Sequence, residues 1–356
     1  MFCAIIIHVN IYIFPFEEIL TMLSIKEVAK LTGLSTATVS RALDPRYSAK
    51  VRPETREKIL AVCDSGNYRP GFAGRSFVTG KSFKVGFISG APADDLGNLF
   101  QGYFFQGAGF ELQKAGYSLL LLCAPDCEEK SGQIVNFLRS GVADAYILGN
   151  SLFTGVVRKA VEECKAPVLR LNRLQSLEGN MVLRNDIRPA FREIWRRIPE
   201  DLRPQTLFCC RTQNENKYHV ASELAPEGML LPFVELPTSV NFAEVRSHAC
   251  SAARENLEKL LKYKVFWCSS DLMALGIMDA LEETGKIAGK DFYLIGYDNI
   301  EGLPHCAGNA FLSTVNGAWE YEGVVAARMI LDALEGRHPG EKVIELEYIS
   351  RKSFPF

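Results

Sequence analysis

Apolar residues between positions 24 and 43 repeat with the period of an α-helix, in two short runs separated by a glycine. Ser24, followed by Glu27 three residues later, has the spacing of a capping box, which predicts the start of the first helix. Gly33 lies past its end, where a left-handed residue often closes a helix. Ser35 is placed to cap the second helix. The predicted helices span 25–31 and 36–43.

The second of these helices has an apolar side and a polar side. Val39, Ala42 and Leu43 share the apolar side, whereas Ala37 and Arg41 point the opposite way, into solvent. Small side chains let a helix approach the floor of the DNA major groove, and arginine can bond both O6 and N7 of guanine. The pattern favours a helix-turn-helix, although any small helical domain can contain two amphipathic helices and a turn.

A third helix is predicted over 53–65, because proline suits the first helical position. Ile59, Val62 and Cys63 can close the core of a three-helix domain. The residue before the helix, Arg52, is a weaker cap than serine. The first part of the chain is therefore expected to be a small all-α domain.

From position 84 onward, short apolar runs alternate with segments of helical period. This alternation predicts parallel sheets with crossover helices, and its two runs predict two α/β lobes. No GxGxxG or GxxxxGK[ST] motif opens a helix after a strand, so a nucleotide fold with phosphate loops is not supported. The predicted strands are 84–88, 118–123, 145–148, 167–171, 207–210, 265–268 and 293–296, and the helices between the first of them are 100–114 and 129–139.

Composition adds a strong charge asymmetry to this picture. The chain has 356 residues, enough for two or three domains, and is 47% hydrophobic, as in an ordinary globular protein. Its net charge is only -2, yet residues 22–82 hold 11 Lys and Arg against 5 Asp and Glu. A basic head on an acidic remainder indicates that only the head meets nucleic acid.

The ten cysteines and the apolar first residues bear on where the protein works. The cysteines lack zinc-type spacing, which predicts reduced, partly buried thiols in a cytoplasmic protein. The apolar run in residues 1–21 is shorter than the roughly 20 residues that span a bilayer. It also lacks the positive start and cleavage site of a signal peptide. We expect residues 1–21 to be an upstream artefact or a disordered arm, with Met22 as the true start, and we expect no membrane partner.

The amino-acid sequence of the helical segment resembles that of a known family. VAKLTGLSTATVSRAL resembles the DNA-binding start of the LacI/galactose-repressor family of bacterial regulators, whose pattern is close to VAxxAGVSxATVSRVLN. APVLRLNR and SSDLMALGIMDALEETGKIAGKDFYLIGYDN resemble later family segments. The resemblance implies a helix-turn-helix head over 22–68, a hinge or linker over 69–82, and a body over 83–356. That body would be a periplasmic-binding-protein-like pair of lobes with three crossovers and a ligand cleft at the carboxyl ends of the strands.

The resemblance also implies a homodimer that binds an inverted repeat of double-stranded operator DNA. In the family, a pair of hinge helices enters the minor groove and a leucine opens the central base step; its match here is Phe77. Gly71 and Gly74 replace the family's Asn and Ala, and each glycine disfavours a helix by roughly 1 kcal/mol. Asp44 replaces an asparagine and would repel phosphate. The expected DNA-binding residues are Ser35, Thr36, Ala37, Thr38, Ser40, Arg41, Tyr68, Arg75 and Phe77.

Four motif matches supply candidate effector-binding residues: Phe100, Arg173, Asp271 and Asp298. Arg173 can take two sugar oxygens or a carboxylate, and the two aspartates can accept from hydroxyls. Together with an aromatic wall, they suit a polyhydroxylated effector. Asp271 can also act as the N-cap of the helix that follows it, and Phe100 can be a core residue.

Further effector candidates stay open at this point. The loop after strand 207–210 usually carries an arginine in the family, and either Arg211 or Lys217 can take its place. Phe242 is a second aromatic candidate. Asn172 replaces the family's aspartate beside Arg173, which removes a charge there.

These features distinguish between three classes of protein: a transcriptional regulator, a sugar-binding protein and an enzyme. A transcriptional regulator is favoured, as a repressor of carbohydrate-metabolism genes controlled by a sugar-like effector; a corepressor-dependent regulator or an activator is the alternative. A plain sugar-binding protein would share the body but needs a signal peptide and no basic head. An enzyme is disfavoured because no histidine sits in a Ser or Cys nucleophile motif. No cofactor or metal is expected.

Overall fold

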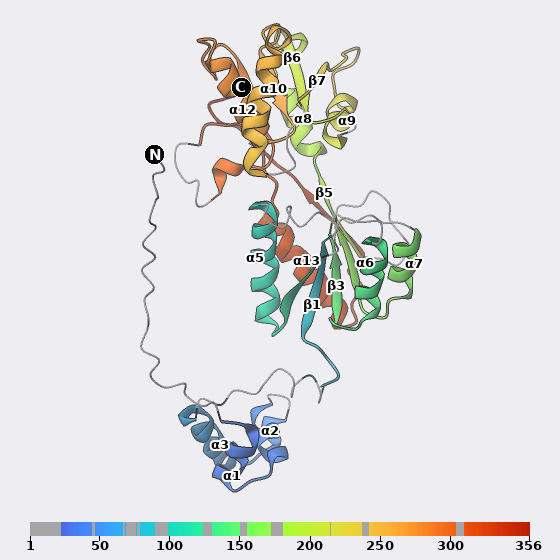
Figure 1. Cartoon of the computed structure of the whole chain (residues 1–356), viewed down its shortest axis with the longest axis vertical. Helices are drawn as coiled ribbons and strands as arrows, with labels where there is room; N and C mark the ends of the chain where they lie inside the picture. Colours follow the sequence, from blue (N-terminus) through green and yellow to red (C-terminus); the bar gives the residue numbers. More distant parts are fainter. Residues whose placement is uncertain are drawn as a thin grey trace, which may run out of the picture. The chain divides into compact units, whose positions relative to one another are not determined.

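The computed structural model of the chain divides into two compact units, Met1–Lys81 and Ser82–Phe356 (Figure 1). No helix in its described part is long and apolar enough to cross a bilayer. The expectations for residues 1–21, Gly71, Gly74, Arg75, Phe77, Asn172 and Arg173 lie outside the described residues. The structure describes residues 23–44, 47–66, 68, 76, 79–89, 99–123, 130–149, 155–171, 181–213, 215–236, 242–303 and 310–356.

The first unit is a three-helix domain built on local signals. The helices α1 (Ile25–Thr32), α2 (Thr36–Leu43) and α3 (Pro53–Ser65) surround a core that includes Val28, Val39 and Ile59, and a short 3-10 turn, Ser48–Lys50, joins α2 to α3. The predicted left-handed closure of α1 at Gly33, with φ of 71°, is confirmed. Arg52 makes no side-chain capping bond, as expected.

The capping box at the start of α1 gives a testable stability effect. Ser24 Oγ accepts from Glu27 N at 3.3 Å, and Glu27 Oε2 accepts from Ser24 N at 2.6 Å. Replacing Ser24 by alanine should cost about 1 kcal/mol of helix stability. Hydrogen exchange of the α1 amides in the full chain should then speed up. Ser65→Ala, at the C-terminal end of α3, should leave this exchange unchanged. Equal protection of α1 in both variants would contradict this role.

Lobe 1 of the second unit is a six-stranded parallel sheet in the order β11-β5-β4-β3-β1-β2. Helices α5 and α13 cover one face, and α6 and α7 cover the other (Figure 1). The strands are β1 (Lys84–Ser89), β2 (Ser118–Cys123), β3 (Ala145–Leu148), β4 (Val168–Leu171), β5 (Met181–Asp186) and β11 (Glu341–Glu345), and the helices are α5 (Leu99–Lys114), α6 (Lys130–Arg139), α7 (Gly155–Glu163) and α13 (Trp319–Leu334).

Lobe 2 is a four-stranded parallel sheet in the order β7-β6-β8-β9. Helices α8 and α9 cover one face, and α10 and α12 cover the other. The strands are β6 (Thr206–Cys210), β7 (Phe233–Glu235), β8 (Val265–Cys268) and β9 (Tyr293–Ile295). The helices are α8 (Arg188–Arg197), α9 (Asn216–Glu223), α10 (Val245–Glu255), α11 (Leu257–Leu260) and α12 (Asp271–Glu282), with 3-10 turns at Arg203–Gln205, Phe242–Glu244 and Ile300–Gly302.

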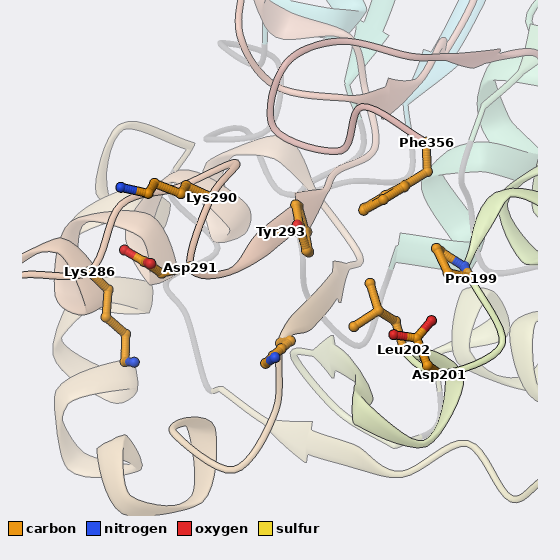
Figure 2. Close-up of a pocket in the computed structure, with 9 residues that line it drawn as sticks. Pro199, Asp201, Leu202, Lys286, Lys290, Asp291, Tyr293 and Phe356 are labelled. Carbon is orange, nitrogen blue, oxygen red and sulfur yellow. The ribbon is translucent and has the colours of Figure 1, made fainter.

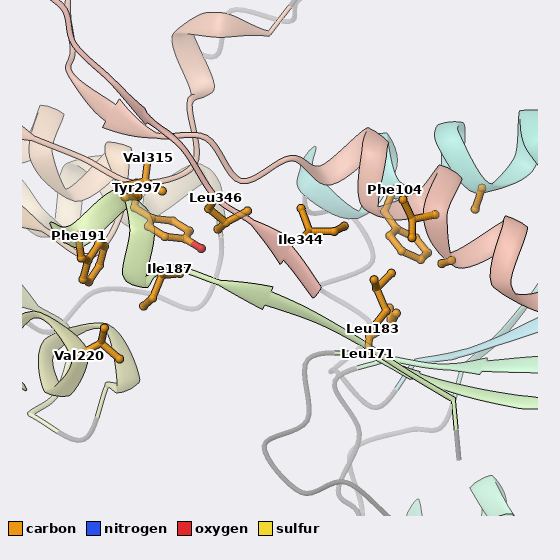
Figure 3. Packing of buried hydrophobic residues seen from close by; sticks show 14 of the residues in the cluster. Phe104, Leu171, Leu183, Ile187, Phe191, Val220, Tyr297, Val315, Ile344 and Leu346 are labelled. Carbon is orange, nitrogen blue, oxygen red and sulfur yellow. The ribbon is translucent and has the colours of Figure 1, made fainter. Parts of the chain in front are cut away.

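Within the described residues the chain passes between the lobes three times, from β5 into α8, from β10 (Thr314–Val315) into α13, and from β11 into β12 (Tyr348–Ile349). β10 and β12 pair antiparallel, and Leu346 N donates to Asp186 O at 2.9 Å. Buried side chains on all three passages, including Ile187, Val315 and Leu346, continue the core from one lobe into the other (Figure 3). The predicted two lobes with three crossovers are thus confirmed.

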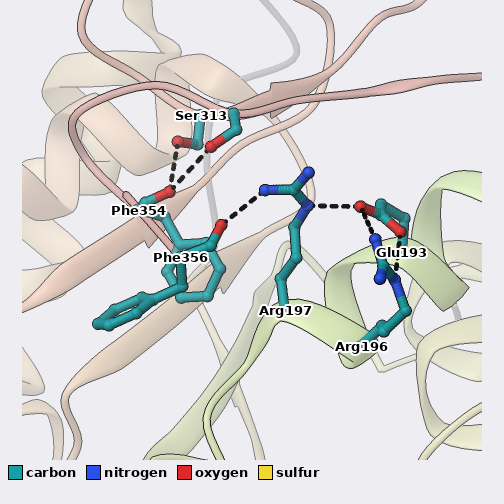
Figure 4. A network of polar contacts seen from close by, with 7 residues as sticks. Glu193, Arg196, Arg197, Ser313, Phe354 and Phe356 are labelled. Carbon is teal, nitrogen blue, oxygen red and sulfur yellow. Dashed lines mark hydrogen bonds and ion pairs between the residues drawn. The ribbon is translucent and has the colours of Figure 1, made fainter.

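The last residues of the chain are tied to lobe 2 through α8. Arg197 donates to the backbone oxygen of Phe356 at 2.7 Å and also to Glu193, which Arg196 contacts as well (Figure 4). Hydrogen bonds from both arginines lower the pKa of Glu193 to about 2. Ser313 Oγ donates to Phe354 O at 3.3 Å, which joins the same segment to the strand entering the second crossover.

Candidate DNA-binding helix and effector cleft

Helix α2 presents a polar face to solvent and an apolar face to the core. Val39 and Ala42 are fully buried, while Thr36, Ala37, Ser40 and Arg41 are exposed. Ser35 caps the helix by accepting from Thr38 N at 3.1 Å, and the two hydroxyls lie 2.9 Å apart. The four exposed residues form one continuous surface, so these side chains, all predicted to bind DNA, are accessible to a groove. Ser35 and Thr38 already bond to each other at its edge.

Tyr68, which is expected to contact DNA, packs in the core of the first unit. It is only 9% exposed, its ring packs in the same cluster as Val28 and Ile59, and its backbone N–H donates to Cys63 O at 2.8 Å. Burial raises the pKa of its hydroxyl. The apolar part of the ring seals the end of the three-helix core, a role that a motif match does not reveal.

An aromatic cluster joins elements from both lobes beside the crossovers. Phe100 from α5 stacks on Trp319, the first residue of α13, with ring centres 5.0 Å apart and planes inclined by 25°. Phe242 from lobe 2 meets the Phe100 ring edge-on at 5.4 Å. Phe100 is 8% exposed, so it is both a packed residue and part of this wall.

Trp319 is a further candidate site residue, which no sequence motif indicated. Its Nε1 is buried and donates to no acceptor among the described residues. Such a donor beside a stacked aromatic pair suits the oxygen of a bound molecule. The sequence feature that could have indicated Trp319 is its position in the closing segment LSTVNGAWEYEG, directly after a passage between the lobes.

A partly buried lysine lies at the carboxyl ends of the lobe 2 strands. Lys217 Nζ donates to Ser269 O at 2.7 Å and lies 3.5 Å from the centre of the Tyr297 ring. Burial lowers the pKa of Lys217, and the carboxylate of Asp298 opposes this most strongly. Arg211 is exposed on the surface. Of the two candidates in this loop, Lys217 is therefore the one that points among the predicted effector residues.

Asp298 has the features expected of a ligand-binding carboxylate. It is 7% exposed, and among the described residues its side chain accepts no hydrogen bond. Burial raises its pKa well above the ordinary value, and the charge of Lys217 acts in the opposite direction. Its backbone has φ of 116°, a conformation that favours glycine and costs energy for other residues. Asp298 N donates to Val315 O at 2.9 Å, so the strained residue is fixed against a crossover strand.

Asp271 is not the N-cap of α12, and its carboxylate accepts hydrogen bonds from two other segments of the chain. Its Oδ1 accepts from Thr314 Oγ1 at 2.6 Å, its Oδ2 accepts from Ile300 N at 2.8 Å, and the residue is 1% exposed. The cap of α12 is Ser270, which accepts from Met273 N at 3.2 Å. The Asp271 carboxylate therefore holds the second crossover to lobe 2, and both of its oxygens are already used.

This position predicts a pH effect on stability. Burial raises the pKa of Asp271 from 3.8 to about 6, although the bonds from Thr314 and Ile300 act against it. A carboxyl whose pKa is higher in the folded chain stabilises the fold below the unfolded pKa, and that stabilisation is lost as the pH rises through the folded pKa. The loss amounts to about 2 kcal/mol between pH 4 and 7.

Asp271→Asn should remove this part of the pH dependence. The difference in unfolding free energy between wild type and variant should therefore change by about 2 kcal/mol from pH 4 to pH 7. Urea unfolding followed by tryptophan fluorescence reports on lobe 2, where Trp195 and Trp267 are buried. Parallel curves for the two proteins would show that Asp271 does not titrate in this range.

A surface pocket also occurs in lobe 2, but away from these residues (Figure 2). Its lining includes Lys264, Lys290 and Tyr293, which lie at the amino ends of β8 and β9. Lys217, Asp298 and Ser269 lie instead at the carboxyl ends of the strands. The pocket is thus separate from the predicted effector site.

Comparisons with known proteins agree with both units. Residues 24–71 match the model of bacterial regulatory proteins of the lacI family, and residues 235–354 match a periplasmic binding protein-like domain. The chain is 22% identical over 333 residues to the HTH-type transcriptional repressor PurR of Vibrio parahaemolyticus, covering 92% of this chain and 96% of that one. It is 23% identical to catabolite control protein A of Priestia megaterium, covering 91% and 96%.

Solved structures share the fold over the same length. The lac repressor bound to ONPG in the repressed state matches with a TM-score of 0.72 and 17% identity, covering 93% of this chain and 99% of that chain. A complex of the transcriptional regulator CelR with cellobiose matches with a TM-score of 0.59 and 20% identity, with the same coverage. Residues 24–71 thus match the DNA-binding domain of the lacI family of bacterial regulatory proteins, and the chain as a whole is similar to regulators of this kind.

Proposed function

We propose that this chain is a transcriptional repressor that reads an inverted repeat of operator DNA with α2 and responds to a sugar-like effector held between its lobes. The observation that supports this proposal most strongly is the exposed polar face of α2. Thr36, Ala37, Ser40 and Arg41 lie on this face, and the buried Val39 and Ala42 lie on the opposite one. A helix of this kind, in a basic three-helix unit, suits the major groove. Such a regulator works in the cytoplasm, where bacterial DNA lies.

A homodimer is the form that we propose for operator binding. The related lac repressor has been solved as a dimer bound to operator and the anti-inducer ONPF. In the present chain, lobe 1 leaves Phe110 of α5, Leu121 of the edge strand β2 and Tyr321 of α13 between 46% and 60% exposed. Large exposed apolar side chains favour a protein partner, and a second copy of the chain would cover them.

The effector would bind where the two lobes and the crossovers meet. Lys217 supplies a charged donor, Asp298 an acceptor with no partner among the described residues, and Trp319 an unused N–H beside the Phe100 ring. Alternating donors and acceptors against an aromatic wall suit the hydroxyls and apolar face of a sugar ring. A ligand that contacts both lobes stabilises one lobe arrangement over another, and this difference can change operator affinity.

Two experiments test the proposal. Immunoprecipitation of the tagged chain with cross-linked chromosomal DNA should recover a small set of promoters that share one inverted repeat. An even distribution along the chromosome would contradict specific repression. A screen of mono- and disaccharides should find at least one that raises the melting temperature of the purified chain and changes its operator affinity; loss of affinity marks an inducer, and gain marks a corepressor.

A further inference from the structure

The chain enters its second unit through a turn that is fixed by a single carboxylate. Asp144 Oδ1 accepts from both Ser82 N at 2.7 Å and Ser82 Oγ at 2.9 Å, and Asp144 Oδ2 accepts from Phe83 N at 2.8 Å. Hydrogen bonds to an ionised carboxylate are stronger than those between neutral groups. Three of them converge here, from the last residue of the predicted linker and the residue that follows it.

This turn is held in a conformation that its own residues do not favour. Phe83 has φ of 53°, in the left-handed region where a non-glycine residue is strained. Its side chain is 7% exposed and packs against Tyr117, with ring centres 5.6 Å apart, and its backbone oxygen accepts from Ser118 N at 3.0 Å. The backbone is therefore pinned on both sides, by Asp144 at its N–H groups and by the lobe core at its ring.

Asp144 is itself rigidly attached to the centre of lobe 1. It directly precedes β3, which lies between β1 and β4, and its N–H donates to Lys84 O at 2.9 Å. At their other ends, β1 and β3 finish at the carboxyl edge of the sheet, where parallel α/β lobes bind ligands. A displacement of this sheet therefore carries Ser82 and the direction of the preceding chain with it.

We propose that Asp144 is a positioning residue that fixes where and in which direction the linker leaves lobe 1, and thereby transmits the arrangement of the lobes to the DNA-binding unit. This inference rests on the proposed function. Without the three hydrogen bonds to Asp144, the turn at Phe83 relaxes, and the linker leaves the lobe in a range of directions. Two helix-turn-helix units then lose the fixed spacing that an inverted repeat demands, while each unit still contacts DNA on its own.

The test uses the full chain with Asp144→Asn, which retains one acceptor oxygen and places an NH₂ group opposite the N–H of Phe83. Ser82→Ala, which removes one of the three bonds, gives an intermediate change. The matched control is Asp291→Asn: Asp291 Oδ2 accepts from Ile287 N at 2.8 Å in lobe 2, so the same chemistry is lost far along the chain from the linker. All variants are compared on the selected operator and on random duplex at the same salt concentration.

Asp144→Asn should lower the ratio of operator affinity to random-DNA affinity by about tenfold, as expected when one charge-assisted bond is lost. Affinity for random duplex should stay within twofold or so, and Asp291→Asn should change neither value. An unchanged ratio in a folded Asp144→Asn protein would overturn the positioning role.

Hydrogen exchange supplies a readout that does not depend on DNA. In Asp144→Asn, faster exchange should be confined to the peptide containing Ser82, Phe83 and Lys84. Faster exchange throughout lobe 1 would mean that Asp144 merely stabilises the lobe, and would overturn the proposal. If the wild-type chain selects no DNA sequence, the proposed function fails. Separately, equal exchange at Ser82 and Phe83 in the wild type and in Asp144→Asn would show that the hydrogen bonds to Asp144 are absent in solution.

Discussion

Replacing Arg41 by alanine should weaken binding to the preferred operator by about 10- to 100-fold, or about 1–3 kcal/mol, and weaken binding to random duplex much less. Arg41 lies exposed in the last turn of α2, next to Ser40 on its polar face. From that position a guanidinium can make two hydrogen bonds to guanine, which random sequence supplies only by chance. Competition measurements with the operator and with scrambled duplex give the two affinities.

Arg56→Ala is the matched control for the loss of charge. Arg56 is exposed on α3 in the same unit and is not among the residues predicted to bind DNA, so its removal takes away the same charge without removing a predicted base contact. Its effect should be similar on both DNAs and should shrink as salt rises. A uniform loss for Arg41→Ala as well would refute the base-reading role and leave Arg41 as a phosphate contact.

Replacing Lys217 by methionine should abolish the response to the effector while the chain stays folded and binds DNA. Methionine has a similar length and apolar stem, but it cannot donate a charged hydrogen bond. A bond to a charged donor is worth about 1.5–3 kcal/mol, which corresponds to a loss of effector affinity of about 10- to 150-fold. Calorimetry with the saccharide that raises the melting temperature of the wild type measures this loss directly.

Arg211→Ala serves as the control for Lys217, because Arg211 lies in the segment that leads from β6 to α9 and its side chain is exposed. It should keep effector affinity within about twofold of the wild type, as surface substitutions usually do. The opposite result, with Arg211→Ala losing the saccharide and Lys217→Met retaining it, would move the effector site away from the buried cluster around Asp298.

The helical head could be predicted from sequence almost to the residue because its signals are local. The caps Ser24 and Ser35 and the closing Gly33 act within one turn of the helices that they delimit, and the predicted bounds of α2 and α3 match the structure. The buried central strands were also predicted, since their apolar runs are continuous. Polar edge strands escaped prediction: β11 buries only Ile344 of its five residues, and its sequence EKVIE has no clear period.

The effector site could be predicted only in part, because its residues depend on contacts between distant segments. Nothing near Asp271 shows that Thr314, 43 positions away, takes one of its carboxylate oxygens. Likewise, the partner that stacks on Phe100 is Trp319, on a helix at the other end of the body. For Asp298 and Lys217 the sequence supplied candidates, and only the fold brought them together.

Selection of random DNA duplexes by the purified chain starting at Met22, at moderate salt and without added ligand, tests the central claim most directly. The proposed repressor should enrich one inverted repeat, with half-sites spaced for two copies of α2 and a flexible pyrimidine–purine step between them. Arg41→Ala should lose that enrichment at one base pair in each half-site. Salt-sensitive binding that enriches no sequence, both alone and with the saccharides that raise the melting temperature, would contradict sequence-specific repression.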